Sequence, residues 1–93
     1  MTKLLIIADD LTGAADTGVQ LAKRGVSTLV LPSVTDFPDA WQYETVVVNT
    51  ESRHASPGIA EEAVTAAVQI GRMHGVPHFY KKDRLNSARK YRR

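Results

Sequence analysis

The fold is decided by one stretch near the start of the sequence, Lys3-Leu4-Leu5-Ile6-Ile7-Ala8-Asp9-Asp10-Leu11-Thr12-Gly13-Ala14-Ala15-Asp16. Its apolar half has no alternating polar residues, which is typical of a strand that is covered on both faces in a parallel sheet. The aspartates end this strand, and the side chain of Asp10 or Thr12 can cap a helix that begins there. A strand that runs directly into a helix predicts a β-α-β unit.

The same alternation of strands and helices continues beyond this stretch. The first helix is expected to end at Gly25, and Ser56-Pro57 is expected to open a second helix. Further strands are expected at residues 26–31, at residues 45–48 and from His78 onward. Residues 33–43 show no clear period and are expected to form a loop with one helical turn. We therefore predict an α/β fold, a Rossmann-like parallel sheet of about four strands with flanking helices.

The apolar side chains of each helix indicate which of its faces packs on the sheet. In the first helix these residues are Ala14, Ala15, Val19, Leu21 and Ala22. In the second helix they are Ile59, Ala63, Ala66, Ala67 and Ile70. We expect both sets to be buried.

The composition excludes several classes of protein. The chain has 93 residues, 43% of them hydrophobic and 24% charged, which suits one small globular domain. It has no cysteine, which rules out disulfides and thiolate metal sites. No apolar run approaches the roughly 20 residues that span a bilayer, and the acidic pair at Asp9-Asp10 comes too early for a signal peptide. We expect a cytoplasmic protein that does not contact a membrane.

The net charge of +2 is unevenly distributed along the chain. Residues 1–80 carry five Lys or Arg against nine Asp or Glu, whereas residues 81–93 carry seven against one. Basic tails of this kind bind nucleic acid or lie in solvent. The body of the domain is therefore acidic, and the basic character belongs to its last residues.

Polar side chains follow the expected strands at the edge where open parallel sheets bind ligands, beyond the carboxyl ends of the strands. Asp9 and Asp10 follow the first strand, where they could bind substrate hydroxyls, coordinate Mg²⁺ or take a proton, or where one could simply cap the helix. Ser52 and Arg53 follow the third strand, and the arginine suits a carboxylate or phosphate unless it pairs with a surface glutamate. The lysine pair that ends at Lys82 follows the fourth strand and could hold an anion or remain solvated. Together these groups suit a small polyhydroxylated acid.

Two other kinds of site are not indicated by the sequence. Residues 9–16 lack the glycine spacing and the lysine of a phosphate loop, and they carry no dinucleotide fingerprint, so they predict no ATP site. The three histidines show no metal-ligand spacing, so no metal site is predicted. Trp41 and Tyr43 are predicted to anchor the core or a loop and not to stack on nucleic-acid bases.

Three motifs resemble those of the four-carbon acid sugar kinases, which include threonate, erythronate and oxo-tetronate kinases. Residues 7–16 resemble the opening motif of that family, residues 47–53 its second motif, and residues 79–82 the start of its third. The resemblance covers residues 3–82 in the right order.

This resemblance implies that residues 1–82 are part of an N-terminal sugar-acid-binding domain. Enzymes of the family use ATP and Mg²⁺ to phosphorylate a hydroxyl of the acid, and a separate C-terminal domain holds the ATP. Carried over to this sequence, the family's substrate contacts would be Asp9, Asp10, Ser52, Arg53 and Lys82. The catalytic residue is not identified by these motifs.

The resemblance stops after Lys82, where the family continues with Thr-Asp-Ser-Thr-Leu-Arg-Gly-Asn-Ile-Gly or a close variant. With a suitable choice of codons for that string, one inserted G shifts the reading to Asp-Arg-Leu-Asn-Ser-Ala-Arg-Lys-Tyr-Arg, which are residues 83–92. We therefore expect residues 83–93 to be a basic tail translated out of frame, in a truncated product. Such a product would bind no nucleic acid, would not hold ATP or Mg²⁺ tightly, and would be inactive alone. Its open sheet edge would permit a homodimer.

Two other classes of protein share some of these features. A Mg²⁺-binding receiver domain of a signalling protein has a similar acidic pair after its first strand, but it has an aspartate where Asn49 stands. A small domain with a basic nucleic-acid-binding arm would account for the charge of residues 83–93, although Tyr91 is the only residue there that could stack on a base. Steeply salt-dependent binding through that arm would distinguish the latter class.

Overall fold

The central strand of the sheet is buried on both faces, as its uninterrupted apolar sequence predicts. The structure is a computed structural model, and it describes residues 2–33, 40–52, 54–82 and 88–91. In it, β1 (Leu4–Ala8) pairs in parallel with β3 (Thr45–Asn49) on one side and with β4 (His78–Lys82) on the other. Because β1 has a strand on each side and helices over its faces, its last four residues are buried.

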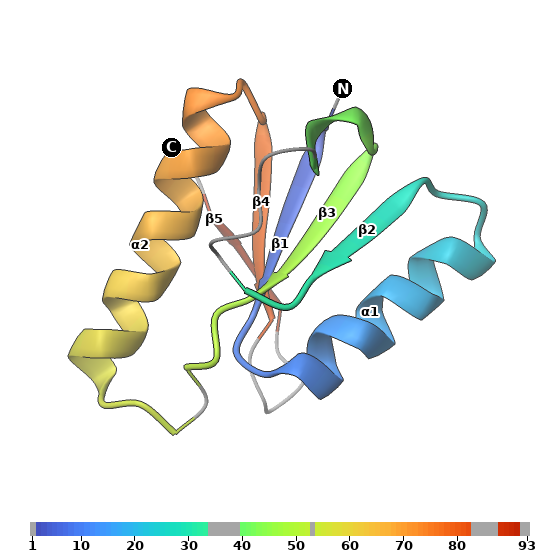
Figure 1. The fold of residues 1–93 in the computed structure, drawn as a ribbon. Coiled ribbons are helices and arrows are strands. Elements are labelled where there is room, and N and C mark those ends of the chain that lie inside the picture. The colour runs from blue at the N-terminus through green and yellow to red at the C-terminus, as the bar shows by residue number, and fades with distance from the viewer. Residues whose placement is uncertain (1, 34–39, 53, 83–87, 92–93) are drawn as a thin grey trace.

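The sheet contains five strands in the order β2-β3-β1-β4-β5 (Figure 1). β2 (Thr28–Leu31) is parallel to β3, so the four predicted strands form one parallel sheet and the predicted fold class is confirmed. β5 (Ala88–Tyr91) pairs with β4 in the antiparallel direction. That strand was not predicted, because it lies in the segment that we expected to be a tail.

The order of the strands separates this sheet from that of a receiver domain. Receiver-like sheets follow the order 2-1-3-4-5, in which the first strand lies between the second and the third. Here β3 lies between β2 and β1. The receiver-like alternative is therefore wrong for this chain.

One face of the sheet is covered by α1 (Leu11–Lys23), which approaches through its smallest residues. Its buried or half-buried positions on this face are Ala14, Gly18 and Leu21. Of the positions predicted to be buried, Ala15, Val19 and Ala22 are exposed, so the prediction was wrong for these three. The helix lies so close that a Cβ added at Gly18 would collide with Val30 of β2. The face that packs is therefore the one that carries Gly18.

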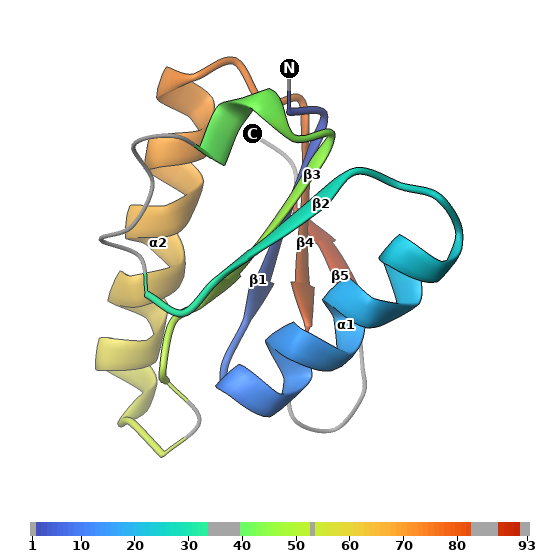
Figure 2. The same ribbon diagram turned by 45° about the vertical axis from the view of Figure 1, so that its right-hand side comes forward.

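The opposite face is covered by α2 (Pro57–Met73), which begins where Ser56 caps its first turn (Figure 2). Its buried residues are Val64, Ala67 and Gly71. The prediction of buried residues is confirmed for Ala67 and partly met by Ala63 and Ile70, which are half-buried. It was wrong for Ile59 and Ala66, which are exposed. The packing face is again rotated toward a glycine, here Gly71, which lies against β4.

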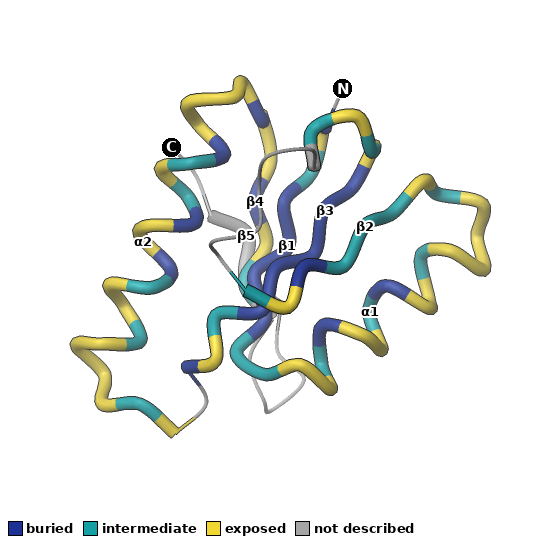
Figure 3. Tube along the Cα trace, in the orientation of Figure 1, coloured by how far each residue is buried: buried dark blue, intermediate teal, exposed yellow. Residues whose placement is uncertain are grey.

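Side chains of the strands alternate into two clusters, one on each face of the sheet. Leu5 and Ile7 of β1 join Phe79 of β4 under α2, whereas Ile6 of β1 packs with Ala14 under α1. Figure 3 shows buried strands between two helices whose outer surfaces are exposed. Among the described residues, no helix has the length and hydropathy needed to cross a bilayer.

The loop after β2 holds the one helical turn that was predicted, η1 (Ala40–Gln42). The ring of Trp41 in this turn stacks on the ring of His74, with centroids 4.3 Å apart and planes inclined by 12°. His74 is the C-cap residue of α2. Trp41 therefore anchors the loop to the end of a helix, as the sequence predicted.

Candidate functional site

Two loops leave the same edge of the sheet and diverge to opposite faces. The chain passes from β1 to α1 on one face, and from the adjacent strand β3 to α2 on the other (Figure 1). The last residues of the central strands are in register there, with Ala8 opposite both Asn49 and Lys82. Such a divergence of neighbouring connections is the switch point at which open α/β sheets bind ligands. The candidate site is this switch point.

The loop after β1 contributes Asp9 and Asp10, both half-buried. An oxygen of Asp10, Oδ1, accepts a hydrogen bond from the backbone N–H of Gly13 at 2.8 Å. Asp10 is thus the N-cap residue of α1. Capping was one of the roles that the sequence allowed for this residue. Its carboxylate is fixed in orientation at the positive end of a helix.

The loop after β3 is tied to the end of β1 and to the loop after it by three hydrogen bonds. The backbone N–H and the hydroxyl of Thr50 both donate to the carbonyl oxygen of Ala8, at 2.9 and 3.0 Å. The backbone N–H of Ser52 donates to the carbonyl oxygen of Asp9 at 2.9 Å. The hydroxyls of Thr50 and Ser52 lie 2.7 Å apart. Ser52 is only 7% exposed, and the contact of its hydroxyl with Thr50 lies within the loop after β3.

Two further residues, Asn49 and Glu51, belong to this edge and were not among the predicted site residues. Asn49 ends β3 and is 1% exposed. Its amide Nδ2 donates to Oε1 of Glu51 at 2.6 Å and to the carbonyl oxygen of Pro32 at 3.2 Å. One feature of the sequence indicates this pair: a polar residue, Asn49, ends a strand of β-branched residues, and an acidic residue, Glu51, follows two positions later.

The five predicted site residues have different outcomes. The structure brings Asp9, Asp10 and Ser52 together at the switch point. Lys82 does not follow β4 as expected but is its last residue, and its backbone lies opposite Ala8. Arg53 lies outside the described residues. Asp9, Asp10 and Ser52 thus lie at the predicted ends of the strands, and their role as substrate contacts stays a prediction.

ATP and Mg²⁺, which the family resemblance implies, find no matching donor set in the described part of the chain. There, no group of three or more His or acidic side chains could hold a metal ion. The turn from β1 into α1 carries Asp10 and a single glycine, Gly13, and not a glycine-rich phosphate cradle.

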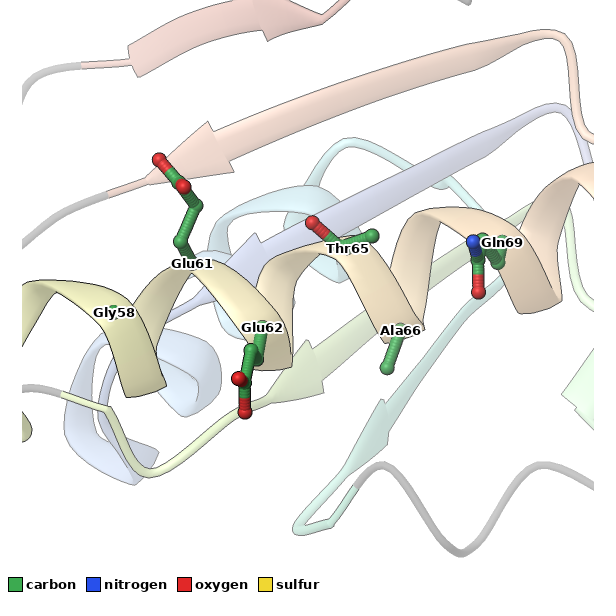
Figure 4. A pocket seen from close by; sticks show the side chains of 6 residues that line it. All are labelled: Gly58, Glu61, Glu62, Thr65, Ala66 and Gln69. Atoms are coloured by element: carbon green, nitrogen blue, oxygen red, sulfur yellow. The ribbon is translucent and has the colours of Figure 1, made fainter.

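A hollow of about 430 Å³ lies elsewhere, on the outer side of α2 (Figure 4). Its described lining residues all belong to that helix: Gly58, Glu61, Glu62, Thr65, Ala66 and Gln69. Two of these are acidic and none is basic, so the hollow suits a carboxylate ligand poorly. The switch point, and not this hollow, is the candidate site.

The fold and the switch point place this chain in the class of open α/β domains, whose ligands generally bind at the carboxyl ends of the parallel strands. The family model described as the sugar-binding N-terminal domain matches residues 4–88. The chain belongs to this family of domains, and its similarity to a D-threonate kinase and a D-erythronate kinase supports membership of the four-carbon acid sugar kinase family. The resemblance stated from the sequence is thereby confirmed.

Two kinases with curated names are similar to most of the chain. A D-threonate kinase of Salmonella typhimurium (strain LT2) is 47% identical over 66 residues, which cover 71% of this chain and 15% of the kinase. A D-erythronate kinase of Heliobacterium modesticaldum is 35% identical over 71 residues, which cover 74% of this chain and 16% of the kinase. The chain thus spans about one sixth of the length of these relatives.

Two crystal structures share the fold. One, from Salmonella typhimurium LT2, superposes with a TM-score of 0.81 at 28% sequence identity, over 89% of this chain and 20% of that one. The other, from Bordetella bronchiseptica, has a TM-score of 0.75 at 35% identity, over 87% of this chain and 21% of that one. The latter is described as a domain-swapped dimer with bound citrate.

Proposed function

We propose that this chain binds a four-carbon sugar acid of the threonate, erythronate or oxo-tetronate type, as the substrate-binding part of an ATP-dependent kinase. The reaction of such a kinase is transfer of a phosphoryl group from ATP to a hydroxyl of the acid. The similarity to a D-threonate kinase and a D-erythronate kinase supports this class of substrate.

The observation that carries the proposal is the direct tie between the two loops at the switch point. Because Ser52 donates to the carbonyl oxygen of Asp9, the acidic loop after β1 and the loop after β3 are held as one surface. Carboxylates such as those of Asp9 and Asp10 accept hydrogen bonds from the hydroxyls of a sugar acid. In the proposal, Arg53 and Lys82 supply the positive charge for its carboxylate.

We further propose that these 93 residues do not transfer phosphoryl groups by themselves. Phosphoryl transfer needs groups that clamp the γ-phosphate and align the attacking hydroxyl. The sequence contains no phosphate-loop pattern that could cradle ATP. Mixing the chain with ATP, Mg²⁺ and D-threonate should therefore yield no phosphorylated acid, and turnover in this mixture would contradict the proposal.

Binding of the sugar acid is tested by titration calorimetry with D-threonate and D-erythronate. Butyrate, which has the same number of carbons and one carboxylate but no hydroxyls, serves as the control ligand. We expect binding of a sugar acid, no binding of butyrate, and loss of sugar-acid binding in Asp9→Asn. Glu44→Gln makes the same change of charge at an exposed position before β3 and should leave binding unchanged. Equal binding of butyrate would contradict recognition of the hydroxyls.

A homodimer is a second part of the proposal. The Bordetella bronchiseptica relative is a domain-swapped dimer, and open sheet edges favour exchange or pairing between copies. Light scattering after gel filtration should give twice the mass of one chain, and a monomer at all concentrations tested would contradict it.

We also propose that residues 83–93 are translated out of frame. The family match ends at residue 88, within the tail, and β5 adds four residues of backbone pairing to β4. Backbone pairing does not depend on the identity of the side chains, so a strand here is compatible with a shifted frame. Reading the gene beyond the codon of Lys82 tests the idea: a kinase-like continuation in the neighbouring frame is expected, and its absence would refute it.

A further inference from the structure

The turn that follows β3 has an unusual backbone conformation. Glu51 has a φ of 55°, and it is the one non-glycine residue with positive φ in the part of the chain that the structure describes. The other positive values in that part belong to Gly25 and Gly75, which end helices. The left-handed region is unfavourable for residues with a Cβ and is normally occupied by glycine. A glutamate there calls for a compensating interaction.

That interaction is a reciprocal pair of hydrogen bonds with Asn49. The backbone N–H of Glu51 donates to Oδ1 of Asn49 at 2.9 Å. In return, Nδ2 of Asn49 donates to Oε1 of Glu51 at 2.6 Å. One bond fixes the backbone of Glu51 and the other fixes its side chain. A glycine in the same position could make the first bond but not the second.

The pair is anchored to the sheet on both sides. Asn49 is buried and its second amide hydrogen bond reaches the carbonyl oxygen of Pro32, directly after β2. The residue after Glu51 is Ser52, whose backbone N–H donates to the carbonyl oxygen of Asp9 after β1. The turn at Glu51 therefore connects the ends of three neighbouring strands.

We propose that Asn49 and Glu51 are a positioning pair for the sugar-acid site. The carboxylate of Glu51 holds the left-handed turn, and the turn directs the backbone of Ser52 toward Asp9. If φ of Glu51 returned to negative values, the chain from Ser52 onward would leave the loop after β1. The role in ligand binding rests on the proposed function, whereas the role in shaping the turn does not.

Hydrogen exchange at the backbone amide of Ser52 tests the effect on the turn, because that amide donates across to Asp9. Three substitutions separate the contributions. Glu51→Gln keeps a side-chain oxygen that can accept from Asn49, whereas Glu51→Ala removes that acceptor. Glu51→Gly removes the acceptor as well, and it also removes the Cβ that makes a positive φ unfavourable. Glu44→Ala, at an exposed residue before β3, is the matched control.

We expect the amide of Ser52 to exchange at least about tenfold faster in the Ala and Gly variants, as loss of one hydrogen bond implies. The Gln variant and the control should exchange at the rate of the original protein. Normal protection in Glu51→Gly would overturn the proposal, because it would show that backbone freedom alone is enough. Far-UV circular dichroism of each variant verifies that the sheet and helices are retained.

The affinity for D-threonate, measured by titration calorimetry on the same proteins, tests the effect on the site. We expect it to fall by about tenfold in the Ala and Gly variants and to be retained in the Gln variant. If the original chain does not bind D-threonate, the proposed function fails while the exchange experiment still decides whether the pair holds the turn. If the chain binds and the affinity is unchanged in variants that have lost protection at Ser52, the positioning role is wrong.

Discussion

Gly71 of α2 lies directly against the ring of Phe79 in β4. A Cβ added at Gly71 would lie 2.6 Å from Cε2 of Phe79 and 3.1 Å from Cδ2 of Leu5. Both of these side chains are completely buried. The distance between the helix and the sheet is therefore set by the absence of a side chain at one position.

The first prediction is that Gly71→Ala destabilises the fold. The added methyl group must displace a ring that has no free space, which costs about 1–3 kcal/mol, and the gain in helix propensity offsets only about 1 kcal/mol of this. We expect a net loss of up to about 2 kcal/mol in the free energy of unfolding, measured by urea denaturation.

The matched control for this substitution is Gly58→Ala in the first turn of the same helix. A Cβ at Gly58 has no neighbour within 4 Å. This variant should be unchanged or stabilised by up to about 1 kcal/mol. If both variants lost the same stability, the cause would be loss of glycine as such and not the contact with Phe79.

The second prediction concerns Gly18 and Val30, which meet between α1 and β2. A Cβ at Gly18 would collide with Cγ2 of Val30, and the β-branched side chain has few rotamers with which to avoid it. Gly18→Ala should therefore cost about 1–3 kcal/mol. Val30→Ala removes the colliding atom. The double variant should therefore lose less free energy of unfolding than the two single variants lose together, and the difference is the coupling energy. Additive effects in urea denaturation would show that the two residues do not meet.

These two glycines also explain which features of the helices could be predicted from the sequence. The existence of both helices and the start of the second at Ser56-Pro57 followed from local signals, as did Asp10 as one of two candidate caps, and all are confirmed. The faces that pack on the sheet did not follow, because the prediction ranked positions by hydrophobicity. Glycine scores low on that scale, yet close approach to a flat, β-branched sheet surface favours the smallest residue.

The third prediction tests the hydroxyl of Thr50, which donates to the end of β1 and contacts the hydroxyl of Ser52 in its own loop. Thr50→Val keeps the shape of the side chain but removes its bond to the carbonyl oxygen of Ala8 and its contact with Ser52. The hydroxyl of Ser52 would then be left buried without that partner, at a cost of about 1–3 kcal/mol. Thr65→Val, at an exposed position of α2, is the control and should change stability by less than about 0.5 kcal/mol.

Adding Ser52→Ala to Thr50→Val should recover part of the lost stability, because the unpartnered hydroxyl is removed. Without such recovery, the 2.7 Å contact between the two hydroxyls would not contribute to stability.

The candidate site was located from the sequence more reliably than its internal contacts. Parallel strands must align their carboxyl ends, so the sequence alone was enough to place the residues after β1 and β3 at one edge. The left-handed turn at Glu51 could not be foreseen, because a glutamate gives no local signal for positive φ. β5 was missed for a different reason: the sequence of residues 83–93 was interpreted as out of frame, and that interpretation carries no expectation of secondary structure.

The last prediction separates the two roles of Asp10, which caps α1 and is proposed to contact the sugar acid. Asparagine is as good an N-cap residue as aspartate, whereas alanine is not. Asp10→Asn should therefore retain the bond to the N–H of Gly13 and nearly all of the stability, while Asp10→Ala should lose about 1 kcal/mol. If Asp10 contacts the substrate through its charge, both variants should lose affinity for D-threonate in titration calorimetry, although only one of them is destabilised. If affinity instead follows stability, and Asp10→Asn binds normally, the residue is a cap and the hydroxyls of the sugar acid must be held by other groups, of which Asp9 is the nearest in the sequence.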